Sequence, residues 1–262
     1  MYLLVDIGNS HIKIALAQGR DIQQVWRMES RVGRTKDEYI VLLQHWLSAS
    51  KVYQTGSLER LIVASVVAPI SEQFVPALEQ VSQRTAITVS SQLLIELGLL
   101  DFAVANHHEA GADLLVSAVA ALVLEDPAEQ RLVIDMGSAT TFNLLTCPHH
   151  FGGVSIAPGI AASERALRQV APALPPVPLH VPDSPLGNDT ITAIQAGVVL
   201  GYISMVEGMI ARVDSQQDTR TLVIATGGSS HLIAPNCPRI DHTIANLTLD
   251  GLAVIAGALA KN

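Results

Sequence analysis

The stretch "LLVDIGNSHIKIAL" (residues 3–16) places an acid, a glycine and two small polar residues between two aliphatic runs. Aliphatic runs joined by such a turn predict a β-hairpin, with strands at about 2–7 and 11–17. The hairpin carries Asp6 and Lys13 toward the same bend. A glycine in the turn also lets backbone N–H groups face an anion with no side chain in the way. We therefore expect a ligand between Asp6 and Lys13.

A second stretch, "LVIDMGSATTFNLL" (132–145), repeats the same pattern about half a chain later. Asp135 and Gly137 follow an aliphatic run and precede a second one, as Asp6 and Gly8 do. The repeat predicts an α/β fold of two duplicated domains, an N-terminal half at 1–110 and a C-terminal half at 111–262. The cleft between two such halves is the natural place for a ligand.

The composition limits the class of protein. The chain has 262 residues, of which 49% are hydrophobic and only 4% aromatic, as expected for strands buried on both faces. A net charge of −8 argues against binding to nucleic acid, which needs a basic surface. The most apolar stretches, such as 114–124, reach about half of a membrane span, and no basic leader precedes them. We expect a cytoplasmic protein without membrane contact.

The remaining pattern predicts alternating helices and strands. Cys147 and Cys237 lie far apart in the sequence, so we expect no disulfide framework. The proline-rich segment 171–185 predicts an extended surface loop. Helices are expected at 36–49, 70–82, 113–125, 159–169, 190–213 and the C-terminal apolar run, and further strands at 60–67, 86–90, 131–146 and 221–226.

The two hairpins can hold a nucleotide by its phosphates. Turns from opposing halves would enclose the β- and γ-phosphates, and Asp6 would organise Mg²⁺, which prefers oxygen ligands. Lys13 offers a cation to the phosphate oxygens. The alternative is a pair of ordinary turns, where Asp and Gly are favoured anyway. A third strand-to-glycine turn, "ATGGSS" (225–230), suits a nucleoside. Hydrogen bonds to the phosphates are expected from Asn9, Ser10, Ser138, Thr140 and Thr141.

These motifs resemble the acetate and sugar kinase/Hsp70/actin superfamily, whose domains are ribonuclease H-like (actin-like). More narrowly, the chain resembles the type III pantothenate kinase family, which also contains the Bvg accessory factors. The resemblance covers the whole chain. It is carried by "DIGNSHIK" (6–13), "SVV" (65–67), "GAD" (111–113), "DMGSATT" (135–141), "GGVSIAPG" (152–159), "ALPPV" (173–177), "NDTITAIQAGVVLGY" (188–202), "TGG" (226–228) and "NLTLDGLAVIAGAL" (246–259).

The resemblance implies ATP-dependent phosphorylation of pantothenate by a homodimer that needs Mg²⁺ and a monovalent cation, K⁺ or NH₄⁺. It assigns ATP binding to Ser138 and to the segment Asp6, Ile7, Gly8, Asn9, Ser10, His11, Ile12 and Lys13. It assigns the monovalent cation to Asp135. Asp113 is implied as the catalytic base. The implied pantothenate pocket comprises Val104, Gly111, Ala112, Asp113, Leu114 and Thr190.

The role of Asp113 as a base can also be argued from its chemistry alone, without the family resemblance. A carboxylate beside the terminal phosphate can accept the proton of an attacking hydroxyl. The alternative is an N-cap of the following helix, since Asp is a favoured cap. Transfer should be direct, because no Ser, Cys or His lies where a phospho-enzyme would form.

The chain departs from the family pattern near the acceptor. The family motif GxDR reads Gly111-Ala112-Asp113-Leu114 here, so the arginine expected to contact pantothenate is absent. A tyrosine and a proline of the family are replaced by Val104 and His107. Loss of a charge-assisted hydrogen bond costs about 1.5–3 kcal/mol unless another group compensates. Candidates for that role are His107, His108 and Arg168.

The departures leave two rival functions open. One is a nucleotide-binding regulator without catalysis, and the other is a kinase for a different hydroxylated acceptor. Two histidine clusters, 106–109 and 148–150, also suggest zinc, but neither has a spaced partner. Solvated loop histidines are the simpler interpretation.

Overall fold

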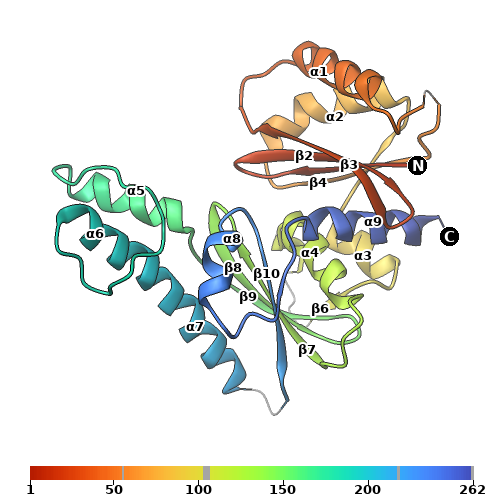
Figure 1. Ribbon diagram of the computed structural model, residues 1–262. Coiled ribbons are helices and arrows are strands. Elements are labelled where there is room, and N and C mark those ends of the chain that lie inside the picture. Colours follow the sequence, from red (N-terminus) through yellow and green to blue (C-terminus); the bar gives the residue numbers. More distant parts are fainter. Residues whose placement is uncertain (55, 103–106, 217–218, 261–262) are drawn as a thin grey trace. The chain divides into compact units, whose positions relative to one another are not determined.

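The fold is taken from a computed structural model that describes residues 1–54, 56–102, 107–216 and 219–260. The chain forms two compact units. The first comprises residues 1–124 together with 247–262, and the second comprises residues 125–246. Figure 1 shows the elements of each unit, coloured along the sequence.

The first unit is built on a five-stranded sheet with the order β3-β2-β1-β4-β5. β1 runs antiparallel to β2 and parallel to β4. The strands are β1 (Tyr2–Ile7), β2 (His11–Gln18), β3 (Asp21–Glu29), β4 (Arg60–Ser65) and β5 (Ala86–Thr88). The other elements are α1 (Lys36–Ala49), α2 (Ala68–Ser82), α3 (Ser91–Glu96), β6 (Asp101–Phe102), η1 (His107–Glu109), α4 (Ala112–Leu122) and α9 (Leu247–Leu259).

Alternation along β1 divides its side chains between two covered faces. Leu3, Val5 and Ile7 join a core that includes residues of α1 and α2, which lie together on one side of the sheet (Figure 1). Leu4 and Asp6 point to the opposite face, where α9 contacts β1 and α4 contacts β4. The side chain of Asp6 is therefore enclosed by helices rather than exposed on a sheet surface.

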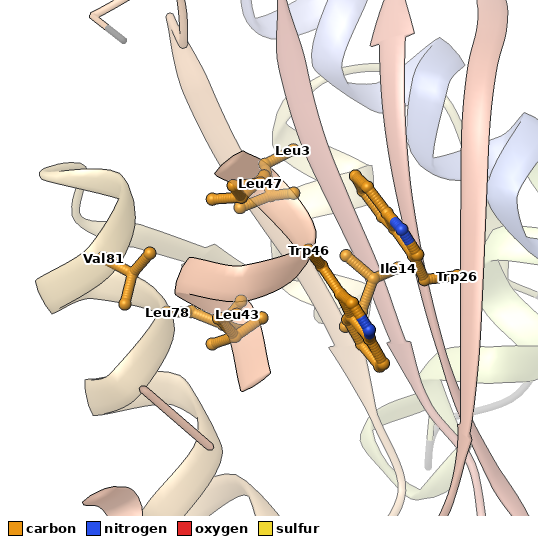
Figure 2. A pocket seen from close by; sticks show the side chains of 8 residues that line it. All are labelled: Leu3, Ile14, Trp26, Leu43, Trp46, Leu47, Leu78 and Val81. Atoms are coloured by element: carbon orange, nitrogen blue, oxygen red, sulfur yellow. The ribbon is translucent and has the colours of Figure 1, made fainter. Parts of the chain in front are cut away.

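Two stacked indole rings mark the outer part of the first core. The Trp26 ring on β3 lies parallel to the Trp46 ring on α1, with centroids 6.1 Å apart. Figure 2 shows these rings beside Leu3, Ile14 and Leu47. The gap between these side chains does not admit a water molecule. It is a packing surface between α1, α2 and the sheet, and we assign no ligand to it.

The second unit repeats the strand order of the first. Within this unit the sheet order is β11-β10-β7-β8-β9, with β7 antiparallel to β8 and parallel to β10. The strands are β7 (Gln130–Met136), β8 (Ala139–Thr146), β9 (His150–Pro158), β10 (Thr221–Thr226) and β11 (His242–Thr243). The helical elements are α5 (Ile160–Val170), α6 (Thr190–Gln195), η2 (Ala196–Leu200), α7 (Gly201–Asp214), α8 (Ser230–Ile233) and η3 (Ala234–Asn236).

The repeat confirms an α/β protein with two similar sheets, although the strands β3, β6, β9 and β11 were not predicted. β3 and β9, the third strand of each set, lack the hydrophobic pattern of a buried strand, because each carries many exposed residues. The helix expected at 36–49 is confirmed as α1, which Thr35 and Glu38 begin with reciprocal capping bonds. The two compact units are defined by their internal contacts and not by the sequence repeat. The boundary between the duplicated halves at 110/111 therefore stays a prediction.

The helix expected at 190–213 is continuous but contains a π-helical turn, η2, between α6 and α7. The run Thr190–Asp214 has 25 residues and is long and apolar enough to cross a membrane by length and composition alone. Our expectation that apolar stretches reach only half a span was wrong for this helix. Core helices pass the same test, so the finding is weak support for a membrane span.

Candidate functional site

Three side chains of the first unit converge on the buried end of the first hairpin. Asp6 and Lys13 are cross-strand partners on β1 and β2, and their charged groups lie 3.3 Å apart. The hydroxyl of Thr248, at the start of α9, donates to Asp6 Oδ2 at 2.9 Å. It also accepts a hydrogen bond from Lys13 Nζ at 3.2 Å. Asp6 is only 5% exposed, so its negative charge is compensated inside the protein.

The turn that follows β1 leaves polar side chains exposed. The Gly8 N–H bonds the His11 carbonyl at 3.1 Å, and the Ser30 hydroxyl donates to the Gly8 carbonyl at 2.6 Å. Asn9, Ser10 and His11 are exposed on this turn. Two other members of the predicted ATP-binding segment are not exposed. Ile7 and Ile12 are fully buried in the core, so a nucleotide could reach only their backbone groups.

Asp113 lies at the start of α4, in the same unit as Asp6. Its carboxylate accepts the Leu114 N–H at 2.8 Å. The helix N-cap is Gly111, not Asp113, so the N-cap interpretation of Asp113 is wrong. Burial raises the pKa of the Asp113 carboxyl above its ordinary value. The Asp6 carboxylate adds to the rise, whereas the Leu114 N–H and Lys13 oppose it.

The neighbours of Asp113 form a tight helix start. A Cβ on Gly111 would lie 2.6 Å from Asp113 Oδ1, so the glycine leaves room for the carboxylate. Ala112 and Leu114 are buried at 9% and 8% exposure, and Leu114 packs within the unit as an apolar residue. Val104 lies outside the described residues.

The second hairpin places Asp135 beside two glycines. The pKa of the Tyr202 phenol is raised by burial and also by the Asp135 carboxylate, which places Asp135 near that ring. Gly227 follows β10 with φ +90°, and a Cβ there would lie 2.3 Å from Asp135 Oδ1. The Ser229 N–H bonds the Met136 carbonyl at 3.0 Å, so the predicted third turn contacts the second hairpin. Ser138 is exposed at the bend.

One predicted phosphate contact of this hairpin is wrong. The Thr140 side chain is fully buried, and its hydroxyl is bonded to the Pro158 carbonyl and to Tyr202. It is not available to a phosphate. Thr141 is also buried, at 9% exposure, and its hydroxyl accepts a hydrogen bond from the Asn143 side chain at 3.2 Å.

The close approach at Gly227 predicts a large mutational effect. We expect Gly227→Ala to lose nucleotide binding and at least about 1–3 kcal/mol of stability, because its Cβ would meet the Asp135 carboxylate and the Met136 backbone. Its left-handed φ is a further strain for alanine. Gly228→Ala is the matched control for stability, since its Cβ meets nothing within 4 Å. Nucleotide titration and thermal melting of both variants test this, and equal behaviour of the two would contradict it.

Thr190 lies at the rim of a hollow within the second unit. The hollow has a volume of about 740 Å³ and is lined by α5, by the loop before α6, and by α6 to α7. Its walls are mainly apolar, and the residues with polar side chains among those that line it are Ser163, Thr190 and Tyr202. An exposed Thr190 at such a hollow is compatible with contact to a small ligand.

Of the three candidates to replace the family arginine, Arg168 already has a partner, and the side chain of His107 lies outside the described residues. Among the residues described, no three His, Cys, Asp or Glu side chains gather as a metal cluster. Arg168 is bonded to Glu164 on α5 at 2.7 Å, so its guanidinium is already engaged.

Sequence reasoning missed two residues that organise these sites. Thr248 lies in the quoted motif "NLTLDGLAV", but nothing in the sequence indicates that its hydroxyl meets Asp6 and Lys13. Tyr202 closes the motif "NDTITAIQAGVVLGY", yet its bond to Thr140 joins residues that are 62 positions apart. Only the folded chain reveals such contacts.

The family model and the relatives found by sequence indicate the same family. The family model for type III pantothenate kinase matches residues 2–212. A type III pantothenate kinase of Dehalococcoides mccartyi is 36% identical over 251 residues, which are 96% of this chain and 93% of that protein. One of Thermus thermophilus is 35% identical over 96% of this chain and 97% of that protein.

Among solved structures, a ROK family glucokinase from Streptomyces griseus, in complex with glucose and AMPPNP, has a TM-score of 0.51 and 12% identity. The match covers 97% of this chain and 98% of that one. This likeness concerns the fold alone. It confirms the expected pair of ribonuclease H-like, actin-like domains.

Proposed function

We propose that this chain, which belongs to the type III pantothenate kinase family, transfers the γ-phosphate of ATP to the hydroxyl of pantothenate, with Asp113 as proton acceptor. The product is 4′-phosphopantothenate, and the step opens coenzyme A biosynthesis. The observation that carries the assignment of Asp113 is its half-buried carboxylate, whose pKa is raised beside the Asp6–Lys13 pair.

The raised pKa of Asp113 suits a general base. A base is most effective when its pKa approaches the working pH, because it is then ionised yet still binds a proton well. Burial moves the pKa of Asp113 in that direction. The Leu114 N–H fixes one carboxylate oxygen at 2.8 Å, which leaves the other to meet a substrate hydroxyl. The proton moves from that hydroxyl to the carboxylate as the phosphoryl group is transferred.

Asp6, Lys13 and Thr248 form the proposed phosphate end of the ATP site. Lys13 is 19% exposed in its side chain and can turn its ammonium toward phosphate oxygens while Thr248 keeps Asp6 hydrogen-bonded. Two carboxylates, Asp6 and Asp113, act on one another here beside a single ammonium, so the local charge favours a further cation. Asp6 would hold Mg²⁺, which neutralises phosphate charge when bound.

The second hairpin is assigned to the rest of the nucleotide and to the monovalent cation. Ser138 is exposed at the bend, where its hydroxyl and the adjacent backbone can meet ATP. Asp135 offers an oxygen donor of the type that K⁺ or NH₄⁺ requires, next to the backbone of Gly227 and Met136. Thr190 and its hollow are assigned to pantothenate.

We also propose that the protein is a cytoplasmic homodimer. Val170 at the end of α5 and Leu186 in the following loop are 82% and 80% exposed, and Ile191 on α6 is 47% exposed. Large apolar side chains that stay exposed within one segment of the chain favour a protein contact. Light scattering coupled to size-exclusion chromatography should report a mass of two chains, and a single-chain mass would overturn the dimer.

Coupled ADP release tests the function itself. With ATP, Mg²⁺, K⁺ and pantothenate we expect turnover of about 1–100 s⁻¹, the usual kinase range. Leaving out pantothenate should abolish it. Turnover in this range would also mean that Leu114, in place of the family arginine, is compensated. ATP binding without pantothenate-dependent turnover would overturn the acceptor, and a screen of other hydroxylated acids would then separate a different kinase from a regulator.

A further inference from the structure

A short chain of hydroxyl groups connects a helix with the second hairpin. The Tyr202 hydroxyl on α7 lies 2.6 Å from the hydroxyl of Thr140 on β8. Thr140 Oγ1 in turn donates to the Pro158 carbonyl at the end of β9, at 3.2 Å. A threonine hydroxyl has a single proton, so the Tyr202 hydroxyl must be the donor to Thr140. The bonds therefore run in one direction, from Tyr202 through Thr140 to Pro158.

Two members of this chain, Thr140 and Pro158, border the turn at Gly137 and Ser138. Thr140 is the cross-strand partner of Met136, the last β7 residue before the turn. Pro158 precedes Gly159, where a Cβ would lie 2.4 Å from the Gly137 carbonyl oxygen. On the side of Gly159 the turn is thus packed with no space for a methyl group, whereas Ser138 remains exposed.

The helix that carries Tyr202 also forms one wall of the hollow that we assign to pantothenate. Gly197, Gly201 and Tyr202 line this hollow from η2 and α7. The π-helical turn η2 comes directly before Gly201 and Tyr202. A π-turn contains one extra residue, so it changes which side chains of α7 face the sheet. Tyr202 is buried at 5% exposure, with its ring beside the hollow and its hydroxyl on the hairpin.

We propose that Tyr202 is a positioning residue for the nucleotide site, because its hydroxyl, acting through Thr140, holds the Gly137–Ser138 turn in the shape that receives ATP. The inference rests on the proposed function, which assigns this hairpin to ATP. A contact that served only the core would stabilise the fold equally without affecting the affinity for ATP. The two roles therefore differ in whether loss of the hydroxyl weakens the binding of ATP.

Tyr202→Phe removes one oxygen and keeps the ring in place. We expect the KM for ATP and the dissociation constant of ATP to rise about 3- to 10-fold, which is the usual contribution of one neutral hydrogen bond. The kcat and the KM for pantothenate should remain within about twofold, since the apolar wall is intact. Coupled ADP release gives the kinetic constants, and titration calorimetry with ATP alone gives the affinity.

The chain offers a matched control in its other unit. Tyr39 is a fully buried tyrosine on α1, and its hydroxyl donates to the Arg31 carbonyl at 3.5 Å. Tyr39→Phe removes the same atom from a buried ring. Its affinity for ATP should equal that of the wild type, even if its Tm changes.

Variants of Thr140 separate a chain of hydroxyls from a local packing effect. Thr140→Ser keeps the hydroxyl and should retain the wild-type affinity for ATP, whereas Thr140→Val should show the weakened affinity of Tyr202→Phe. The double variant Tyr202→Phe/Thr140→Val should be no weaker than either single variant, because both remove the same connection. The two single variants of Thr140 also test the inference if Tyr202→Phe fails to fold.

An unchanged affinity for ATP in Tyr202→Phe, or equal loss in Thr140→Ser and Thr140→Val, would overturn the inference. A wild type that binds no ATP would overturn it together with the nucleotide assignment. A wild type that binds ATP but does not phosphorylate pantothenate would overturn the proposed acceptor and leave the test of Tyr202 intact, since that test reads ATP binding directly.

Discussion

Asp113→Asn should abolish turnover and yet make the protein more stable at neutral pH. A missing general base typically costs about 10²- to 10⁴-fold in rate. The side chain of asparagine fills the same space, so the loss should appear in kcat while ATP binding persists. The gain in stability follows from burial, which disfavours the ionised carboxylate and raises its pKa.

The dependence of this gain on pH has a definite sign. A carboxyl whose pKa is raised in the folded state favours folding only when it is protonated. For Asp113 that contribution is fully present below the ordinary Asp value of about 3.9 and is lost as the pH rises through the folded-state pKa. The variant should therefore melt above the wild type at pH 7–8, and the two Tm values should converge as the pH falls toward about 4.

Asp250 provides a matched control for the stability effect. It is a half-buried carboxyl on α9 whose pKa is raised by burial alone. Asp250→Asn should raise the Tm at neutral pH in the same way but leave kcat unchanged. Thermal melts from pH 4 to 8 and coupled ADP release on the three proteins test the pair. Full activity of Asp113→Asn would remove Asp113 from the chemistry.

The hairpins and most helices were predictable because they depend on local patterns. Aliphatic runs broken by Asp-x-Gly identify β1 and β7 without reference to any other part of the chain. The pairing of Asp6 with Lys13 follows from the same pattern, since a tight hairpin fixes the register of its strands. β3 and β9 lack such a pattern, because β3 is rich in polar residues and β9 contains Gly152 and Gly153, so both resemble a loop.

The contacts that complete the site were not predictable, because they join distant segments. Thr248 and Asp6 are 242 positions apart. They meet only because α9 packs against β1 within the first unit. The role expected of Thr140 failed for a similar reason, since nothing near it in sequence indicates that Tyr202 occupies its hydroxyl. Spacing identifies the residue types that a site needs, whereas burial decides which atoms remain available.

Gly251→Ala should damage both stability and activity, because α9 crosses α4 at this glycine with no space for a methyl group. A Cβ at position 251 would lie 1.8 Å from the Val116 carbonyl oxygen and 2.7 Å from its carbon. Both atoms belong to the α4 backbone, so no side chain can rotate to relieve the overlap and the helices must separate. Overpacking of this kind costs about 1–3 kcal/mol and sometimes more.

The activity should fall because the two helices carry the site. α9 brings Thr248 to Asp6 and Lys13, and α4 brings Asp113 to the same end of the sheet. Separation of the helices would pull these groups apart, so we expect kcat/KM to fall at least about tenfold, as misplacement by about 1 Å can cost 10²-fold. Urea unfolding and coupled ADP release measure the two effects.

Gly257→Ala on the same helix is the control for the intrinsic effect of alanine. A Cβ at position 257 meets nothing within 4 Å, so the substitution should stabilise the helix by about 0.5–1 kcal/mol and leave turnover unchanged. Opposite signs for two glycine-to-alanine changes in one helix would show that contact with α4, rather than helix propensity, decides the outcome at Gly251. A stabilised Gly251→Ala would instead mean that α9 does not pack against the Val116 backbone, and the placement of Thr248 beside Asp6 would lose its support.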